Sequence, residues 1–332
     1  MDRIPYEIFV SSSRSLHWLD GSPNTWTQRR LLGAKRYHAE VADKCRIILE
    51  LIPSAFGMCW IAHYTALKDL SLLMTSEGDK FNLFFILAGE VEYRSQAQAA
   101  TATQWQLNIV KASSINHELL IKQDKGLIAL NLFIQTKMLK AYQHTFPILI
   151  KWLLSWQENK DTTALKHNVD DDGRLQSIVD AWWTAGLPSD EREIEMERFT
   201  FQAFDQLEMM LVAEKVASET ELNSLRKVRA RLLASLFHLQ PPSLSELSQL
   251  AGMHFKRLER LYKAVFGMTM SQFFQEARME AIYRRLCCTT KSLVDISLEF
   301  GYDEYSPFSA AVRRRFDQTP TEIRQSAKME GC

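Results

Sequence analysis

The chain has 332 residues, 46% of them hydrophobic, and equal numbers of basic and acidic side chains, 40 of each. This length suggests two domains, and no apolar run approaches the ~20 residues that a membrane-spanning helix needs. The first residues lack a basic stretch followed by a long apolar core, so we expect neither a signal peptide nor a membrane partner. The five cysteines have no metal-binding spacing and suit the reducing cytoplasm.

The charge is unevenly distributed along the chain. Residues 225–328 carry 17 Lys/Arg and 10 Asp/Glu, a net charge of +7, whereas residues 1–224 carry 23 and 29, a net charge of −6. A basic C-terminal region beside an acidic N-terminal one is typical of a protein in which one domain meets phosphate groups. An ordinary solvated basic face gives the same count, so the charge alone does not decide.

Residues 1–136 are predicted to form a β-rich domain, although the first 55 of them give no clear pattern. Beyond these, runs rich in β-branched and aromatic residues alternate with turn formers such as Asp124-Lys-Gly126. The runs are MCWIAHYTAL, FNLFFILAGEVEYRS, WQLNIVKA, HELLIK and GLIALNLFIQ. Several short strands at this spacing predict a small barrel or a sandwich.

Helical periodicity replaces this pattern over residues 137–224. Pro147 interrupts the first helical stretch, and another helix is predicted to follow Gly173. In a third stretch one face carries only apolar residues: Phe199, Ala203, Leu207, Met210 and Leu211. This stripe is either core or a dimer seam, and the sequence leaves both open. Residues 218–224 are predicted to be the linker to the C-terminal domain.

Residues 243–324 contain the same helix-turn-helix pattern twice. Gly252 of the first copy lies 49 residues before Gly301 of the second, and a serine precedes each glycine by four residues. Glycine at this position permits the positive φ of a tight turn, and apolar residues follow at helical spacing. The duplication predicts helix-turn-helix units at 244–265 and 293–316, within an all-α domain spanning 225–328.

Capping signals agree with these helices. Ser243-x-x-Glu246, Ser292-x-x-Asp295 and Thr319-Pro-x-Glu322 each have the form of a capping box. Residues 271–286 are predicted to form one helix between the copies. At ~1.5 Å per residue that helix is roughly 24 Å long. It can hold two recognition helices about one DNA turn, ~34 Å, apart.

This C-terminal stretch resembles the DNA-binding domain of the AraC/XylS family of bacterial transcription regulators. The resemblance covers about residues 225–326 and rests on the paired units, on Arg278, Met279 and Ala281, and on the closing GYDEYSPFSAAVRRRFDQTPTEIR. It implies recognition helices at about 254–266 and 304–316. It also implies double-stranded promoter or operator DNA and RNA polymerase as partners, and a homodimer formed through helices that precede the DNA-binding domain.

A second resemblance concerns the N-terminal region. The segment FFILAGE at 84–90 resembles the strand–Gly–Glu step in the cupin-like sensor domains of AraC-type proteins. Parts of 81–135 are similar to the siderophore-responsive branch of the family. The predicted fold class is therefore α+β. It comprises a cupin-like β-rich effector-sensing domain at 1–136, a helical dimerisation and linker region at 137–224, and the two-unit all-α domain.

The register implied by the family directs several side chains of the first recognition helix towards DNA. Arg260 suits the O6 and N7 atoms of guanine, Glu259 accepts a hydrogen bond from cytosine N4, and Lys256 also faces bases. Arg257 and Lys263 favour phosphates. The alternative interpretation is that all five are ordinary polar helix residues.

The second recognition helix departs from the family pattern. Ala310 occupies the position where many members carry a base-reading arginine, and it offers only apolar contact. The remaining candidates are Tyr305, Ser306 and Ser309 for bases, and Arg313, Arg314 and Arg315 for phosphates. We therefore expect the first unit to contribute more sequence recognition than the second.

Other kinds of site find little support in the sequence. His63 and His117 stand apart with no His-x-His pair, so we expect no metal. Without a glycine-rich phosphate loop or a nucleophile elbow, we expect no cofactor, no catalytic residue and no enzyme. Aromatic residues at 81–85, with Trp60, Tyr93 and Trp105, either line an effector pocket or form core.

The sequence thus predicts a cytoplasmic, sequence-specific DNA-binding transcription regulator whose N-terminal domain binds a small-molecule effector. Two alternatives stay open. The N-terminal domain either binds a partner protein instead of a small molecule, or it is a cupin-like enzyme fused to a DNA-binding domain. Neither the operator, the effector nor the choice between activation and repression follows from the sequence.

Overall fold

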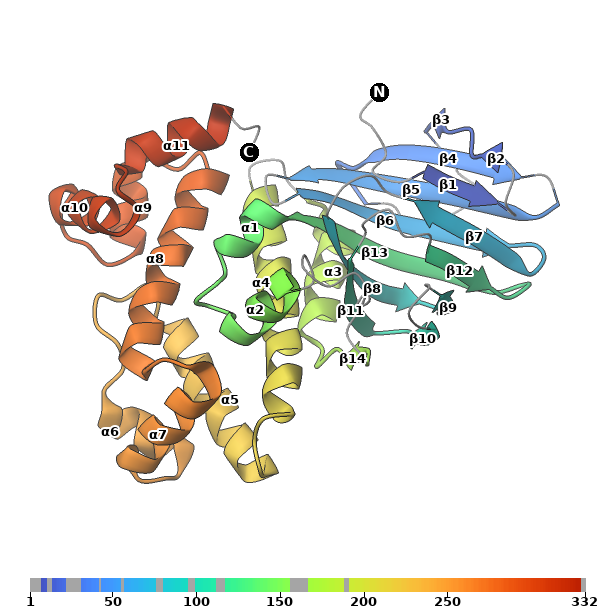
Figure 1. The fold of residues 1–332 in the computed structure, drawn as a ribbon. Helices are drawn as coiled ribbons and strands as arrows, with labels where there is room; N and C mark the ends of the chain where they lie inside the picture. The colour runs from blue at the N-terminus through green and yellow to red at the C-terminus, as the bar shows by residue number, and fades with distance from the viewer. Residues whose placement is uncertain are drawn as a thin grey trace. The chain divides into compact units, whose positions relative to one another are not determined.

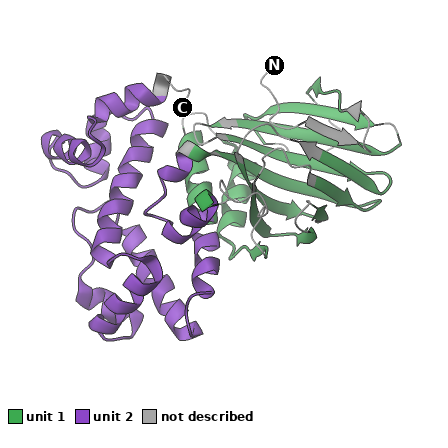
Figure 2. Cartoon of the chain, in the orientation of Figure 1, with its two compact units in different colours: residues 1–136, 154–203 green, residues 137–153, 204–332 purple. Residues whose placement is uncertain are grey.

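The computed structural model describes residues 7–10, 14–21, 31–41, 43–54, 57–75, 80–94, 99–111, 117–155, 167–187 and 191–329. The chain divides into two compact units (Figure 2). Unit 1 comprises residues 1–136 and 154–203, and unit 2 comprises residues 137–153 and 204–332. No helix among the described residues is long and apolar enough to cross a bilayer.

Two antiparallel sheets form the body of unit 1 (Figure 1). The six-stranded sheet has the order β10-β9-β12-β7-β1-β2, and the eight-stranded sheet has the order β14-β11-β8-β13-β6-β5-β4-β3. The strands are β1 Glu7–Val10, β2 Arg14–Ser15, β3 Leu19–Asp20, β4 Lys35–Val41, β5 Cys45–Ser54, β6 Gly57–Ala66, β7 Leu70–Thr75, β8 Lys80–Ala88, β9 Glu90–Arg94, β10 Ala99–Thr103, β11 Gln106–Lys111, β12 His117–Ile121, β13 Gly126–Gln135 and β14 Val169–Asp170. The β-rich N-terminal domain predicted from the sequence is confirmed.

Side chains alternate along β8 between two surroundings. Phe84 faces the space between the sheets, where its ring lies 5.4 Å from that of Tyr93 in β9. Phe85 points to the other side of β8 and lies 6.2 Å from Phe199 of α4 (Arg192–Ala213). Phe199 in turn packs at 5.5 Å against Trp182 of α3 (Arg174–Ala185). One face of the sheet therefore lines the interior, and the other is covered by helix.

The predicted strand–Gly–Glu step is a corner at which the chain leaves one sheet for the other. Gly89 lies between β8 and β9 with a φ of 83°. A Cβ built on Gly89 would collide with the backbone oxygen of Gly126. Glycine is therefore required here both by the backbone conformation and by the close approach of β13.

Unit 2 is helical. Its helices include α5 Glu219–Ala234, α6 Leu244–Ala251, α7 Phe255–Phe266, α8 Met270–Cys288, α9 Leu293–Glu299, α10 Tyr305–Phe316 and α11 Pro320–Met329. Most of α1 (Thr136–Lys140) and of α2 (Pro147–Ser155) also belongs to it, together with residues 204–213 of α4. The predicted helical region at 137–224 is therefore divided between the two units.

The apolar stripe of α4 is core within the single chain. Phe199, Ala203 and Leu207 are fully buried, and Leu211 is nearly so. Met210 is partly exposed. Because a seam between two chains needs a free face, this burial removes the stripe as a reason to expect a dimer.

The predicted linker at 218–224 is wrong. Ser218 is the N-cap of α5, and its side chain accepts a hydrogen bond from the backbone N–H of Glu221. Polar residues at a helix start look like a loop in the sequence, because the residues that cap helices also favour turns. The helix contains all of these residues after its cap.

Candidate nucleic-acid interface

The two predicted helix-turn-helix units are present and share one turn geometry. Gly252 after α6 and Gly301 after α9 have φ values of 64° and 75°. In both turns the residue after the glycine donates its backbone N–H to the serine carbonyl, with Met253 to Ser248 at 3.3 Å and Tyr302 to Ser297 at 3.0 Å. This pattern is the Schellman motif, which closes a helix by satisfying its last carbonyls. The duplicated Ser and Gly therefore reflect one backbone requirement met twice.

Helix α7 presents the five side chains predicted to meet DNA from the first unit. Its other face is buried through Leu258, Tyr262, Val265 and Phe266. The five candidates are all exposed: Lys256, Arg257, Glu259, Arg260 and Lys263. Within the described part of the chain, two of these side chains, Arg257 and Arg260, make polar contacts.

The guanidinium of Arg257 lies 3.0 Å from the carboxylate of Glu221 in α5. Arg260 Nε donates to the carbonyl of Lys256 at 3.2 Å, one turn earlier. Both arginines are exposed, so their present contacts cost little to exchange for contacts with DNA.

In α10 the candidates are more varied in their surroundings. Ser306, Arg313 and Arg314 are exposed, whereas Tyr305 and Ser309 are partly buried. The Tyr305 ring lies 5.9 Å from that of the buried Phe308. Tyr305 therefore packs against the core of this unit.

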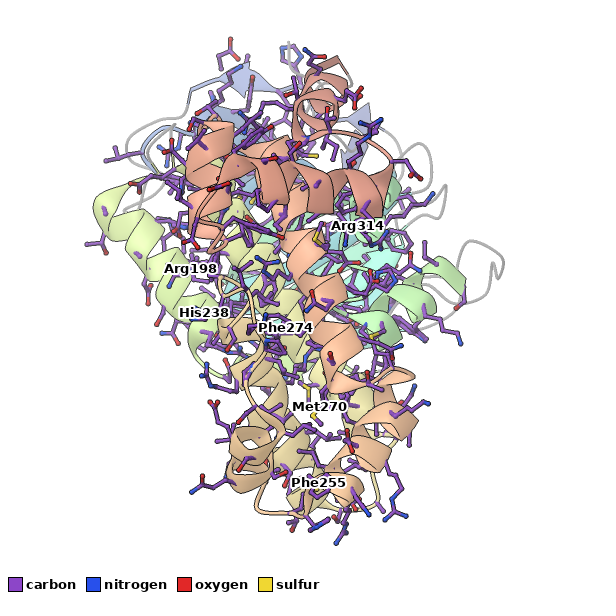
Figure 3. The ribbon with its side chains drawn as sticks, turned by 90° about the vertical axis from the view of Figure 1, so that its left-hand side faces the viewer. Arg198, His238, Phe255, Met270, Phe274 and Arg314 are labelled. Atoms are coloured by element: carbon purple, nitrogen blue, oxygen red, sulfur yellow. The ribbon has the colours of Figure 1, made fainter. Side chains whose placement is uncertain are left out.

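The run of three arginines at 313–315 does not act as one group. Arg315 donates to the carboxylate of Glu276 in α8 at 2.9 Å from Nε, and its guanidinium lies over the ring of Phe316. Arg313 and Arg314 are exposed. Figure 3 labels Arg314 towards one end of unit 2 and Phe255, at the start of α7, towards the other. Sequence alone gave no signal that separates Arg315 from its neighbours.

The helix before each unit supports the carbonyl that precedes the turn glycine. The hydroxyl of Ser224 in α5 donates to the carbonyl of Ala251 at 2.8 Å. The guanidinium of Arg278 in α8 donates to the equivalent carbonyl, that of Phe300, at 2.6 Å. Arg278 also donates to the Tyr302 hydroxyl at 3.0 Å and lies 4.7 Å from the centre of that ring. These supports hold each turn to its own preceding helix, and sequence analysis missed both.

Helix α8 also holds the segment between α1 and α2. The buried carboxylate of Glu280 accepts from the backbone N–H groups of His144 and Thr145 at 2.7 and 2.8 Å, and from the Thr145 hydroxyl at 2.7 Å. Burial alone raises the pKa of Glu280, but the hydrogen bonds from His144 and Thr145 and the charge of Arg284 bring it below its usual range. The carboxylate is therefore the stable form in this setting. The hydrogen bond to Glu280 also raises the pKa of His144.

A second buried charge fastens the same segment. Arg229 of α5 donates to the carbonyl of Thr145 at 2.7 Å and pairs with Asp205 of α4 at 3.1 Å. Its guanidinium lies 5.1 Å from the ring centre of Phe146 and 5.2 Å from that of Phe273. Since Arg229 is only 1% exposed, removing any of these partners would leave a charge poorly compensated in the core.

Unit 1 offers a different kind of site. Of the aromatic residues predicted to line a pocket or form core, Phe84 and Tyr93 line a cavity between the sheets. Phe81, Phe85 and Trp60 are buried away from it. Within the described residues no group of three His, Cys, Asp or Glu side chains is arranged to hold a metal ion.

Comparison with known proteins identifies the C-terminal region. A family described as "Helix-turn-helix domain" matches residues 247–326. The HTH-type transcriptional regulator ExsA of Pseudomonas aeruginosa is 30% identical over 105 residues, which cover 32% of this chain and 38% of ExsA. The regulatory protein SoxS of Escherichia coli is 27% identical over 85 residues, covering 26% of this chain and 79% of SoxS.

A solved structure of a transcriptional regulator from Chromobacterium violaceum, described as having an AraC-type DNA-binding domain, is 29% identical. The match covers 32% of this chain and 95% of that one, with a TM-score of 0.29. The matched part spans only 38% of ExsA and 31% of the Salmonella typhimurium regulator Rob, so it concerns the C-terminal domain and not the whole of those proteins.

Proposed function

We propose that this chain is a sequence-specific transcription regulator of the AraC type, on the basis of its C-terminal helix-turn-helix domain, and that its N-terminal unit binds an effector. One observation carries the DNA-binding part. Two helix-turn-helix units, each with an exposed polar face on its second helix, are joined by the single helix α8. The region around them carries the net charge of +7 that contact with phosphates favours.

Promoter or operator DNA is the proposed partner, with α7 as the main reading helix. Arg260 and Glu259 have the chemistry to distinguish bases, whereas the opening turns of α10 offer hydroxyls and Ala310. A homodimer, a contact with RNA polymerase and a cytoplasmic location are further proposals taken from the family. A place in the siderophore-responsive branch is likewise a proposal, taken from the resemblance of the sequence.

Selection of binding sites from random duplexes with the full chain tests this proposal. Wild type should enrich one motif, and its affinity for that motif should fall steeply as salt rises, because phosphate contacts release counterions. Arg198→Ala is the charge-matched control, since Arg198 is exposed on α4 in unit 1 (Figure 3). This control should leave the motif unchanged. Enrichment of no motif at any salt concentration would refute the proposal.

Effector control is supported by the path of the chain between the two units. Strand β13 lines the cavity of unit 1 and leads directly into α1 and the segment at 141–149. Glu280 of α8 and Arg229 of α5 bind that segment through buried hydrogen bonds. A ligand that shifts β13 therefore has a covalent connection to residues bonded to the DNA-binding helices.

The alternative partner for unit 1 is another protein instead of a small molecule. A cavity between the sheets favours the small molecule, because small ligands bind in concave sites with few polar groups. Saturable thermal stabilisation of the full chain by a small molecule would support this choice, and its absence across a diverse compound set would favour the protein partner.

A further inference from the structure

The cavity in unit 1 has a mostly apolar wall. It contains about 620 Å³ of empty space, including the part open to solvent, and residues from both sheets line it. Most of the wall is apolar, and of the described residues that line it none carries a formal charge. A wall of this kind favours an uncharged occupant, because an ion would lose its hydration without gaining a counter-charge.

Two asparagines supply the main polar group of this wall. Asn82 of β8 and Asn131 of β13 are 6% and 8% exposed. The Asn82 side-chain N–H donates to Asn131 Oδ1 at 3.1 Å, and the Asn131 side-chain N–H donates to the Ala129 carbonyl at 3.4 Å. Across the described residues, Asn82 Oδ1 has no hydrogen-bond donor. A buried amide oxygen without a donor is costly, and Asn82 Oδ1 has almost no accessible surface, so it becomes an acceptor for a ligand once the Asn82 side chain turns towards the cavity.

Aromatic rings form the part of the wall that is fixed in place. Phe84 meets Tyr93 edge to face, with ring centroids 5.4 Å apart. The Tyr93 hydroxyl donates to Asn168 Oδ1 at 3.1 Å, which holds the ring in its position. Burial raises the pKa of both Tyr64 and Tyr93, so both phenols on this wall stay neutral.

We propose that this cavity binds a neutral, ring-sized apolar molecule that carries one hydroxyl or N–H group. The ring lies against Phe84 and Tyr93, and the donor bonds to Asn82 Oδ1. This inference names the class of effector and rests on the proposed function only for the role of the ligand in regulation. A sugar fits poorly, because most of its hydroxyls would lose water without finding partners. An anionic ligand fits poorly for want of a cation on the wall.

Titration calorimetry of the full chain without DNA tests the ligand class with three probes. Phenol has the ring and the donor, anisole has the same ring with an oxygen that cannot donate, and benzoate is charged. Phenol should bind, anisole should bind roughly tenfold more weakly, and benzoate should not bind. Equal affinities for phenol and anisole, or tighter binding of benzoate, would overturn the inference.

Two variants locate the site. Asn82→Leu keeps the branching of the side chain and has no acceptor, so it should abolish the preference for phenol over anisole while anisole still binds. Ala129→Leu fills the cavity and keeps both asparagines, so it should weaken phenol and anisole alike. A cooperative thermal unfolding transition shows that a variant is folded. If only one of the two variants folds, that variant alone is enough to locate the site. Unchanged binding of both probes in the folded variant would place the site elsewhere.

The role in regulation is measured separately, as the affinity of the phenol-saturated chain for its selected DNA motif. Phenol binding with the expected preference, but with no change in DNA affinity, supports the cavity inference and refutes effector control by this class of ligand. A change in DNA affinity that anisole and benzoate produce equally well supports effector control and overturns the ligand class.

Discussion

In the first helix-turn-helix unit, the carbonyl before the turn glycine accepts a hydrogen bond from a neutral hydroxyl, that of Ser224. In the second unit the equivalent carbonyl accepts from a buried guanidinium, that of Arg278, which also stacks on Tyr302. The backbone need is the same, and two different side chains on two different helices meet it. Duplication of the fold has therefore kept the turn and changed its support.

The exposed faces of the two recognition helices, α7 and α10, also differ. Helix α7 carries the exposed Lys256, Glu259 and Arg260 at the positions that we propose reach base edges. Helix α10 has Ala310 at the corresponding position, and its exposed charges are Arg313 and Arg314. We infer a division of labour in which the first unit reads sequence and the second holds the phosphate backbone.

The largest effect is expected from removing the supports themselves. Arg278→Ala takes away two charge-assisted hydrogen bonds and a ring contact in the core, and it should lower the free energy of unfolding by roughly 3 kcal/mol. Ser224→Ala loses one neutral hydrogen bond, which is worth about 1 kcal/mol. Urea denaturation followed by circular dichroism measures both.

Arg278→Lys is the matched control for charge. It keeps the cation but cannot reproduce the planar fork, so its loss should lie between those of the two alanine variants. Equal losses for Ser224→Ala and Arg278→Ala would show that the two supports are equivalent and would remove the first half of the contrast.

The second largest effect is expected from removing a side chain proposed to read a base. Arg260→Ala should weaken binding to the selected motif by about 1–3 kcal/mol and relax the preference at one base position. Ser309→Ala should leave the preferred sequence intact. Binding-site selection with each variant beside wild type measures this difference. A motif that survives Arg260→Ala and is lost with Ser309→Ala would reverse the assignment of the reading unit.

Two neighbouring arginines test backbone anchoring. Arg314 is exposed, so Arg314→Ala should weaken binding to all duplexes alike and lower the slope of log affinity against log salt by about one. Arg315 is already paired with Glu276, so Arg315→Ala should change this slope less. Affinities at several salt concentrations give the slopes. The same loss of slope in both variants would mean that Arg315 leaves Glu276 for a phosphate.

Local patterns allowed much of unit 2 to be predicted. Gly252, Gly301 and the serines before them fix the turns within a few residues, so the spacing in the sequence carries the information. The supports are different, because Ser224 lies 27 residues from its partner and Glu280 lies 135 residues from Thr145. The periodicity of a sequence reflects local structure and gives no indication of contacts between residues so far apart. A boundary at 225 also separates Glu280 and Arg229 from the segment that they bind.

The sequence did not predict strands β4 and β5 of unit 1, for a similar reason. Strands β4 and β5 pair along residues 35–51, but Arg36 and Glu50 occupy them as an ion pair at 3.0 Å with largely buried side chains. Charged residues at buried positions disguise the alternation that marks a strand. The acceptor on Asn82 was hidden for a related reason. A polar residue in an apolar run carries no sign of whether its partner is protein or ligand.

The smallest effect concerns the helix that follows each recognition helix. Thr269 and Gln272 form a full capping box at the start of α8. At the start of α11, Glu322 takes the place of glutamine and accepts from the backbone N–H of Thr319 at 2.6 Å and from its hydroxyl at 2.9 Å. The hydrogen bond from the Thr319 backbone, followed by that from its hydroxyl, lowers the pKa of Glu322 below its ordinary value of 4.5. The first cap is neutral and the second is ionised.

A carboxyl whose pKa is lowered in the folded state stabilises that state above its unfolded pKa and loses this contribution as pH falls through the folded value. The cap on α11 should therefore weaken below about pH 4.5, whereas the cap on α8 should not respond.

Hydrogen exchange at the Thr319 and Thr269 amides measures the fraying of the two helix starts. Acid should increase exchange at Thr319, at the start of α11, more than at Thr269, at the start of α8. Glu322→Gln should remove this excess, and Gln272→Glu should introduce it at α8. Because general acid destabilisation affects both helices in every variant, only the difference between the two amides counts. If that difference is unchanged by Glu322→Gln, the acid response of α11 arises elsewhere and the two caps are equivalent.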